Sequence, residues 1–187
     1  MGEGGTRVKE IWVRPERCMG CLSCRLACAV AHSAAGHLYG AVTEDPPPRS
    51  RVYVEAVGGR KVPLQCRHCR EAPCVAACPV EALKYQGEEG LVRYHRERCI
   101  GCGFCVLACP FGVIAFRREE GRVLRCDRCH KRPVPACVAA CPTRALVYEE
   151  GTAYQSAKRR LAASAAFGSA ELAVVGFKGP KQSVEEG

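Results

Sequence analysis

Residues 99–110 read Cys99-Ile-Gly-Cys102-Gly-Phe-Cys105-Val-Leu-Ala-Cys109-Pro110, so four cysteines fall within eleven residues and a proline closes the run. Three further groups of four cysteines stand before and after it. Together the four groups use all sixteen cysteines of the 187-residue chain. The other groups are Cys18, Cys21, Cys24 and Cys28; Cys66, Cys69, Cys74 and Cys78; and Cys126, Cys129, Cys137 and Cys141.

The spacing of this run is typical of cysteines that hold 4Fe-4S clusters. Three thiolates at successive three-residue steps can bind one cluster, whereas the fourth, carried away by a short helix, ligates the other cluster of a pair. The groups must therefore pair. Spacing alone leaves open which group pairs with which.

Disulfides and zinc are the other common uses of so many cysteines. Disulfides would suit a secreted protein, but residues 1–13 show no apolar segment and no small-residue cleavage site. Structural zinc joins two separated Cys-x-x-Cys pairs, whereas the first and third groups place three cysteines at successive three-residue steps. Three of the four groups also end in Cys-Pro. The pattern favours iron–sulfur clusters, with a zinc-binding structural protein as the remote alternative.

The net charge of +9 counts every cysteine as neutral. Four clusters, each about −2 with its thiolates, would add about −8 and leave the holoprotein near neutral. The surplus arginines and lysines then compensate cluster charge, and no nucleic-acid partner is expected. With five Phe and one Trp the chain has few large core side chains, so we expect the clusters to contribute to folding.

Membrane insertion is not expected from the sequence. No apolar run approaches the roughly 20 residues that span a bilayer. We therefore expect a cytoplasmic protein without a membrane span of its own, which could dock on a membrane complex.

The segments between the cysteine groups predict short strands and helices, an α+β fold. Alternation over residues 8–13 predicts a strand, and apolar periodicity over 22–33 a short helix. Prolines predict an extended loop over 36–50, and Gly58-Gly59 predicts a hairpin over 51–64. The alanine-rich stretch 152–175 predicts a helix interrupted at Gly168.

An internal repeat organises the middle of the chain. Cys74-Val-Ala-Ala-Cys-Pro-Val-Glu-Ala-Leu83 recurs as Cys137-Val-Ala-Ala-Cys-Pro-Thr-Arg-Ala-Leu146, with eight of ten positions identical. Each copy predicts a one-turn helix followed by a strand, over 83–85 and 146–148. A corresponding strand is predicted over 113–116, after the third group.

The order and spacing of the groups resemble the four-cluster electron-transfer subunits of molybdopterin oxidoreductases and related complexes. The second group has the spacing Cys-x2-Cys-x4-Cys-x3-Cys-Pro, and seven residues separate Cys129 from Cys137 in the fourth. The resemblance covers residues 8–148 and implies two ferredoxin-like halves, in which the first group pairs with the fourth and the second with the third. The implied parts are an outer half of residues 8–35 plus 122–150, an inner half of 51–121, a connecting loop of 36–50 and a C-terminal helix and tail of 151–187.

The resemblance also implies a ligand set for each of four 4Fe-4S clusters. In the outer half the sets are Cys18, Cys21, Cys24 and Cys141, and Cys126, Cys129, Cys137 and Cys28. In the inner half they are Cys66, Cys69, Cys74 and Cys109, and Cys99, Cys102, Cys105 and Cys78.

Residues 18–33, Cys-Met-Gly-Cys-Leu-Ser-Cys-Arg-Leu-Ala-Cys-Ala-Val-Ala-His-Ser, are similar to the opening of the iron–sulfur subunit associated with carbon monoxide dehydrogenase. This similarity implies a carbon monoxide dehydrogenase as one partner and a hydrogenase or flavin oxidoreductase as the electron acceptor. A subunit that serves a formate, aldehyde or thiosulfate oxidoreductase, using molybdopterin or tungstopterin, would share nearly all these features.

The sequence predicts an electron carrier rather than an enzyme. All cysteines are used by closed cluster sites, and no nucleophile–base pair or glycine-rich nucleotide fingerprint is evident. His68 and His130 lie beside cluster cysteines but are not needed as ligands, and we expect both to be solvated surface residues. A catalytic iron–sulfur enzyme would need an open coordination position or a second cofactor motif.

Overall fold

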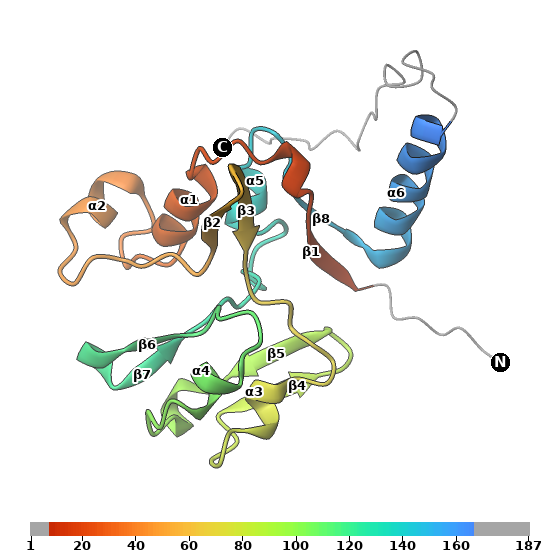
Figure 1. The fold of residues 1–187 in the computed structure, drawn as a ribbon. Helices are drawn as coiled ribbons and strands as arrows, with labels where there is room; N and C mark the ends of the chain where they lie inside the picture. The colour runs from red at the N-terminus through yellow and green to blue at the C-terminus, as the bar shows by residue number, and fades with distance from the viewer. Residues whose placement is uncertain (1–7, 167–187) are drawn as a thin grey trace. The chain divides into compact units, whose positions relative to one another are not determined.

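A computed structural model describes residues 8–166 of the chain (Figure 1). The chain divides after Glu150 into two units. The first carries all sixteen cysteines, and the second contains helix α6 (Gly151–Ala166). Within residues 8–166, no helix is long and apolar enough to cross a membrane.

The first unit contains short helices and four antiparallel strand pairs, in agreement with the α+β prediction. The strands are β1 (Lys9–Val13), β2 (Tyr53–Val57), β3 (Arg60–Leu64), β4 (Leu83–Gln86), β5 (Leu91–Tyr94), β6 (Ala115–Arg117), β7 (Arg122–Leu124) and β8 (Leu146–Glu150). The α-helices are α1 (Ser23–Ala31), α2 (Leu38–Thr43), α3 (Pro73–Ala76), α4 (Phe104–Ala108) and α5 (Ala136–Ala139). Single 3-10 turns are η1 (Pro15–Arg17), η2 (Arg96–Arg98) and η3 (Arg118–Glu120).

Strands β1 and β8 bring the first and fourth cysteine groups together, although they lie far apart in the sequence. They pair antiparallel, with Lys9 opposite Glu150 and Val13 opposite Leu146 (Figure 1). The Trp12 indole donates to the carbonyl oxygen of Glu149 at 3.1 Å. Because the first group follows β1 and the fourth precedes β8, this pairing fixes both groups at one end of the sheet.

The other strands form three local hairpins, β2–β3, β4–β5 and β6–β7. The turn of the first hairpin uses Gly58 and Gly59 at φ +55° and +77°, as the sequence predicts. Strand β6 begins at Ala115 rather than at the predicted Val113. Val113 and Ile114 are buried instead, so packing of these residues takes precedence over pairing.

Two small cores replace one large core. One joins Cys24, Cys28, Val52, Cys137 and Leu146, and the other joins Ala72, Cys74, Leu83, Val92, Cys105, Ile114 and Val123. Each core mixes cysteines from two groups with aliphatic residues. Val52 lies in the core of the first and fourth groups, so the β2–β3 hairpin packs there, and not in the half of residues 51–121 in which it was expected.

Two predicted segments differ from the structure. The segment 36–50, predicted as an extended loop, contains α2. The His37 ring nitrogen Nδ1 accepts a hydrogen bond from the Gly40 N–H and caps this helix at its N-terminus. The prediction relied on the prolines that follow the helix and did not consider this cap. Helix α6 begins at Gly151 and extends to Ala166. The predicted continuation to residue 175, with its interruption at Gly168, lies outside the described residues.

Candidate iron–sulfur cluster sites

The sixteen free thiols gather into four sets, each with three cysteines from one group and one from another. Three sets line small pockets with mostly apolar walls. These sets are Cys18, Cys21, Cys24 and Cys141; Cys66, Cys69, Cys74 and Cys109; and Cys78, Cys99, Cys102 and Cys105.

The fourth set is recognised from the electrostatic interactions of its members. Burial is the main cause that raises the pKa of Cys137, and the charges of Cys126, Cys28 and Cys129 raise it further. Burial likewise raises the pKa of Cys129, and Cys28 again contributes. Cys28, in the second half of α1, shares a buried core with Cys137 of the fourth group. This contact fits a fourth set of Cys28, Cys126, Cys129 and Cys137.

The environment of these thiols fits a bound metal cluster. Burial, followed by neighbouring cysteine charges, raises the pKa of Cys105 to about 11. Such thiols resist ionising together unless a cation offsets their charge, and the iron of a 4Fe-4S core would do so. Backbone N–H groups also point at sulfur, from Arg51 to Cys28 and from Ala82 to Cys78, both at 3.2 Å. Donors of this kind stabilise cluster thiolates.

One backbone feature recurs in the first loop of all four groups. The third residue of each Cys-x-x-Cys segment has a left-handed conformation, with φ of +75°, +49°, +71° and +57° at Gly20, His68, Gly101 and Arg128. A side chain on Gly101 would collide with the carbonyl oxygen of Gly121, so glycine is required there. The shared conformation turns the first two cysteines of each group toward one centre.

His68 and Arg128 occupy strained positions that glycine fills in the other two loops. A left-handed conformation costs a side-chain-bearing residue about 1–3 kcal/mol. Buried hydrogen bonds offset this cost: His68 Nδ1 accepts from Val92 N at 3.2 Å, and Arg128 donates to Gly90 O at 2.7 Å. The second and fourth groups are thereby anchored to strand β5 and to the turn before it.

Comparison with known proteins finds 4Fe-4S domains over the residues that contain the four cysteine groups. A family described as a 4Fe-4S dicluster domain matches residues 58–150, and a 4Fe-4S binding domain matches residues 15–31. An iron-sulfur protein of Rhodospirillum rubrum is 38% identical over 165 residues, covering 80% of this chain and 86% of the relative. The chain belongs to the 4Fe-4S ferredoxin-type electron-transfer proteins.

Two further relatives of this ferredoxin-type protein carry names that state a role. The thiosulfate reductase electron transfer subunit PhsB of Salmonella typhi is 35% identical over 148 residues, covering 71% of each chain. The electron transport protein HydN of Escherichia coli K12 is 32% identical over 147 residues, covering 70% of this chain and 82% of the relative. Like them, the ferredoxin-type protein is an electron-transfer component of oxidoreductase systems rather than the catalytic part, and 4Fe-4S clusters are its cofactors.

One histidine of this ferredoxin-type protein is not the surface residue that the sequence suggested. His68 is 3% exposed, whereas His130 is exposed as expected. Burial, followed by the charges of Arg125 and Arg128, lowers the pKa of His68 to about 2. The ring is therefore neutral and accepts hydrogen bonds through Nδ1. Its left-handed backbone turns the side chain inward, which residue type alone does not reveal.

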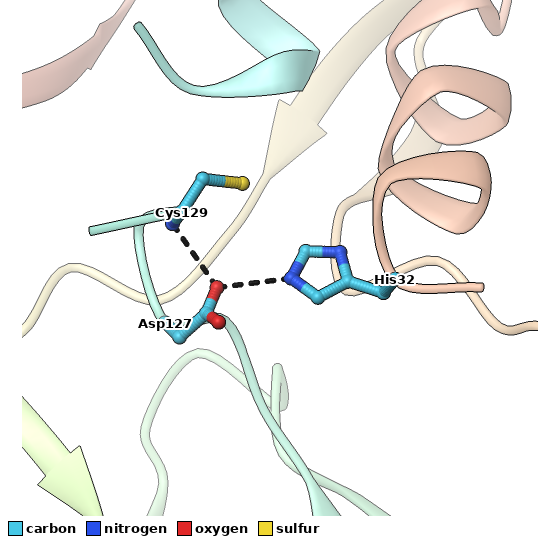
Figure 2. Close-up of side chains that lie close together, drawn as sticks. All are labelled: His32, Asp127 and Cys129. Carbon is cyan, nitrogen blue, oxygen red and sulfur yellow. Dashed lines mark hydrogen bonds and ion pairs between the residues drawn. The ribbon is translucent and has the colours of Figure 1, made fainter. Parts of the chain in front are cut away.

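A polar network beside the fourth set was not identified from the sequence. His32 Nε2 donates to Asp127 at 3.1 Å, and Asp127 also accepts from Cys129 N at 3.0 Å (Figure 2). Arg51 lies 2.9 Å from the second carboxylate oxygen. The other ring nitrogen of His32 is 2.8 Å from the carbonyl oxygen of Cys28.

This network holds Cys28 against the fourth group. Burial alone would lower the pKa of His32, but hydrogen bonds to Asp127 and Cys28 outweigh it and raise the pKa to about 9. The Nε2, Sγ and carboxylate atoms of His32, Cys129 and Asp127 lie within 4.8 Å of one another and could hold an ion. Since three donors already engage Asp127, the group acts as a hydrogen-bonded clamp. Cys28 and His32 are four residues apart, a spacing at which side chains on a helix are neighbours. This spacing is the feature of the sequence that could have indicated the contact between them.

Proposed function

We propose that this ferredoxin-type protein carries single electrons through four 4Fe-4S clusters, between a catalytic oxidoreductase and an acceptor protein. The observation that carries the proposal is the gathering of sixteen thiols into four sets, each shared between two groups. Each cluster exchanges one electron when bound. The cysteines would hold the clusters in place, and all of them except Cys21 and Cys102 are at least partly shielded from water.

Two of the cluster sites suit the ends of the electron path. Cys21 and Cys102 are exposed, whereas their counterparts Cys69 and Cys129 are partly buried. Burial is the main cause that raises the pKa of Cys126, and the charge of Cys66 raises it further. This effect indicates that the set containing Cys66 is near the set containing Cys126. The sets of the second and fourth groups would therefore be internal, and those of the first and third groups terminal.

Apolar side chains surround each exposed terminal cysteine. Met19 and Leu22 flank Cys21, and Ile100 and Phe104 flank Cys102; all four side chains are exposed. Leu107, on the adjoining helix α4, is 85% exposed. Exposed apolar residues beside a redox centre are suited to docking a partner protein. We infer one docking face at each end.

For the catalytic partner we propose a carbon monoxide dehydrogenase, based on the similarity of residues 18–33. A hydrogenase or a flavin oxidoreductase would receive the electrons. The second candidate is a molybdopterin or tungstopterin oxidoreductase. The specific observation in its favour is the 35% identity to a thiosulfate reductase electron transfer subunit.

Anaerobic stopped-flow mixing distinguishes the two partners. Oxidised ferredoxin-type protein is mixed with a carbon monoxide dehydrogenase reduced by carbon monoxide, and the loss of cluster absorbance is followed. We expect bleaching faster than with an unrelated reduced protein, because an apolar docking face would bring a terminal cluster close to the partner's redox centre. Bleaching no faster than with an unrelated reduced protein, together with rapid reduction by a formate or aldehyde oxidoreductase and its substrate, would exclude the carbon monoxide dehydrogenase assignment.

A further inference from the structure

Arg125 is a buried cation in direct contact with a cysteine sulfur. Its side chain is 3% exposed, and one guanidinium nitrogen donates to Cys66 Sγ at 3.1 Å. The other terminal nitrogen donates to Val92 O at 2.7 Å. His68 Nδ1 lies 3.3 Å from the nitrogen that contacts the sulfur. These contacts hold both terminal nitrogens of the guanidinium in place.

The charge balance of Arg125 points to an anionic partner. A guanidinium stays protonated in proteins, and burying it without a compensating charge is costly. Within residues 8–166, no carboxylate lies within ion-pair distance of Arg125. His68 uses Nδ1 as an acceptor from Val92 N and carries no negative charge, and the Val92 carbonyl is uncharged. The remaining partner is Cys66 Sγ, whose charge as a ligand of the proposed cluster would compensate the guanidinium.

Arg125 also lies where the inner and outer cluster sets meet. It directly precedes Cys126 in the chain, while its side chain reaches Cys66. Cys66 in turn is close enough to Cys126 to influence its ionisation. An electron that moves between the two halves would therefore pass beside this cation.

We propose that Arg125 raises the reduction potential of the cluster held by Cys66, Cys69, Cys74 and Cys109, the inner-half cluster nearest to the outer half. This inference rests on the proposed function. Reduction adds one electron to that cluster and breaks no bond, so its net charge becomes more negative by one. A fixed positive charge hydrogen-bonded to a ligand sulfur stabilises the reduced form more than the oxidised form. The step transfers an electron only, and the guanidinium keeps its positive charge throughout.

The test is an anaerobic redox titration with dithionite, followed by visible and EPR spectroscopy. In Arg125→Gln we expect one component of four to become harder to reduce. The ratio of its reduced to oxidised forms at fixed potential should fall at least tenfold, which is about 59 mV for one electron. Arg125→Lys keeps the charge and should give a smaller shift. Arg60→Gln removes an exposed arginine from the β2–β3 hairpin and should leave all four components unchanged.

Iron analysis separates the possible failures. A wild-type protein without four one-electron components would contradict the proposed function itself. If Arg125→Gln retains the wild-type iron content and all four potentials are unchanged, the inference is wrong. It is also wrong if Arg125→Lys shifts the component as far as Arg125→Gln does. The variant Cys69→Ser/Cys74→Ser lacks two ligands of the cluster in question, so the component that Arg125→Gln shifts should be absent from it. If that component is still present, the inference is wrong. Should Arg125→Gln fail to bind iron, Arg125→Met takes its place in the titration, because methionine is neutral and of similar length. Four unchanged potentials in that variant overturn the proposal.

Discussion

At the scale of single residues, polar side chains position the cysteines of the fourth set. Asp127 receives hydrogen bonds from His32 and from Cys129 N, and an ion pair from Arg51. Burial alone would raise the pKa of Asp127, but His32 and Arg51 outweigh it and hold the pKa below its usual range. One carboxylate thus joins α1, the segment before β2 and the fourth cysteine group.

Replacing Asp127 with Asn should weaken the cluster of the fourth set. The asparagine amide would place N–H donors against those of Arg51 or His32, at a cost of about 1–3 kcal/mol. In a chain of this size that lowers the temperature of cluster loss by roughly 2–12 °C. The measurement is thermal bleaching of the visible absorbance, with iron release quantified.

Glu119→Gln is the matched control for Asp127→Asn. Glu119 pairs with Arg49 at 3.3 Å, but both side chains are about half exposed, so its loss should have no measurable effect. If Asp127→Asn bleached at the wild-type temperature, the clamp would have no role in holding the cluster.

The same residues show what sequence reasoning could and could not find. The sixteen cysteines could be predicted as cluster ligands from their spacing, because a loop that binds a cluster needs its cysteines at fixed intervals. Asp127 and Arg125 are ordinary charged residues whose partners lie 95 and 59 positions away in the chain. His68 was predicted to be exposed. A glycine at this position would have indicated a left-handed backbone, but a histidine gives no such indication, so the inward turn of its side chain could not be predicted. Long-range contacts of this kind follow from the fold, not from a local pattern.

At the scale of elements, the internal repeat supplies each core with an equivalent leucine. Leu83 begins β4 and Leu146 begins β8, and both are almost fully buried among cysteines. Leu83 lines the pocket of Cys99, and Leu146 that of Cys18. The repeat predicted these strands correctly, although it did not reveal that β8 pairs with β1 while β4 pairs with β5.

Each leucine should stabilise the clusters that share its core. Truncation to alanine in a packed core costs about 2–5 kcal/mol. Leu146→Ala should therefore release the iron of the first and fourth groups before the rest, about eight of sixteen atoms, and Leu83→Ala the iron of the second and third. Timed chelation with EPR detection of the remaining clusters measures the order. Leu107→Ala, at an 85% exposed position, is the control.

Simultaneous loss of all the iron in both variants would contradict this prediction. The two cores would then behave as one cooperative unit instead of two.

Helix α4 and the residue that caps its C-terminus provide cysteines to two different sets. Cys105 lies near its start with Cys78, Cys99 and Cys102, whereas Cys109 follows its end and lies with Cys66, Cys69 and Cys74. In Cys66→Ser/Cys69→Ser, which lacks the second-group cluster, adding Cys109→Ser should change nothing further. Adding Cys105→Ser should damage the third-group cluster. Iron content and EPR spectra record both outcomes, and further loss of the third-group cluster with Cys109→Ser would refute the exchange of ligands between groups.

At the scale of the whole molecule, the clusters account for features that the polypeptide alone leaves unexplained. The chain has a formal charge of +9 and two small cores with few aromatic residues. Four clusters would bring about −8 and would join each pair of groups through iron–sulfur bonds. The α+β fold could be predicted because the metal ligands dictate the loops. The packing of the β2–β3 hairpin on the core of the first and fourth groups could not be predicted. It depends on contacts of Val52 with residues that are distant in the sequence, such as Cys137 and Leu146.

The most direct test of the central claim is anaerobic metal and acid-labile sulfide analysis of the purified protein. Four 4Fe-4S clusters require about sixteen iron atoms and about sixteen sulfides per chain, with no zinc. We predict this stoichiometry. A preparation that holds stoichiometric zinc and little iron, yet transfers electrons, would contradict the account.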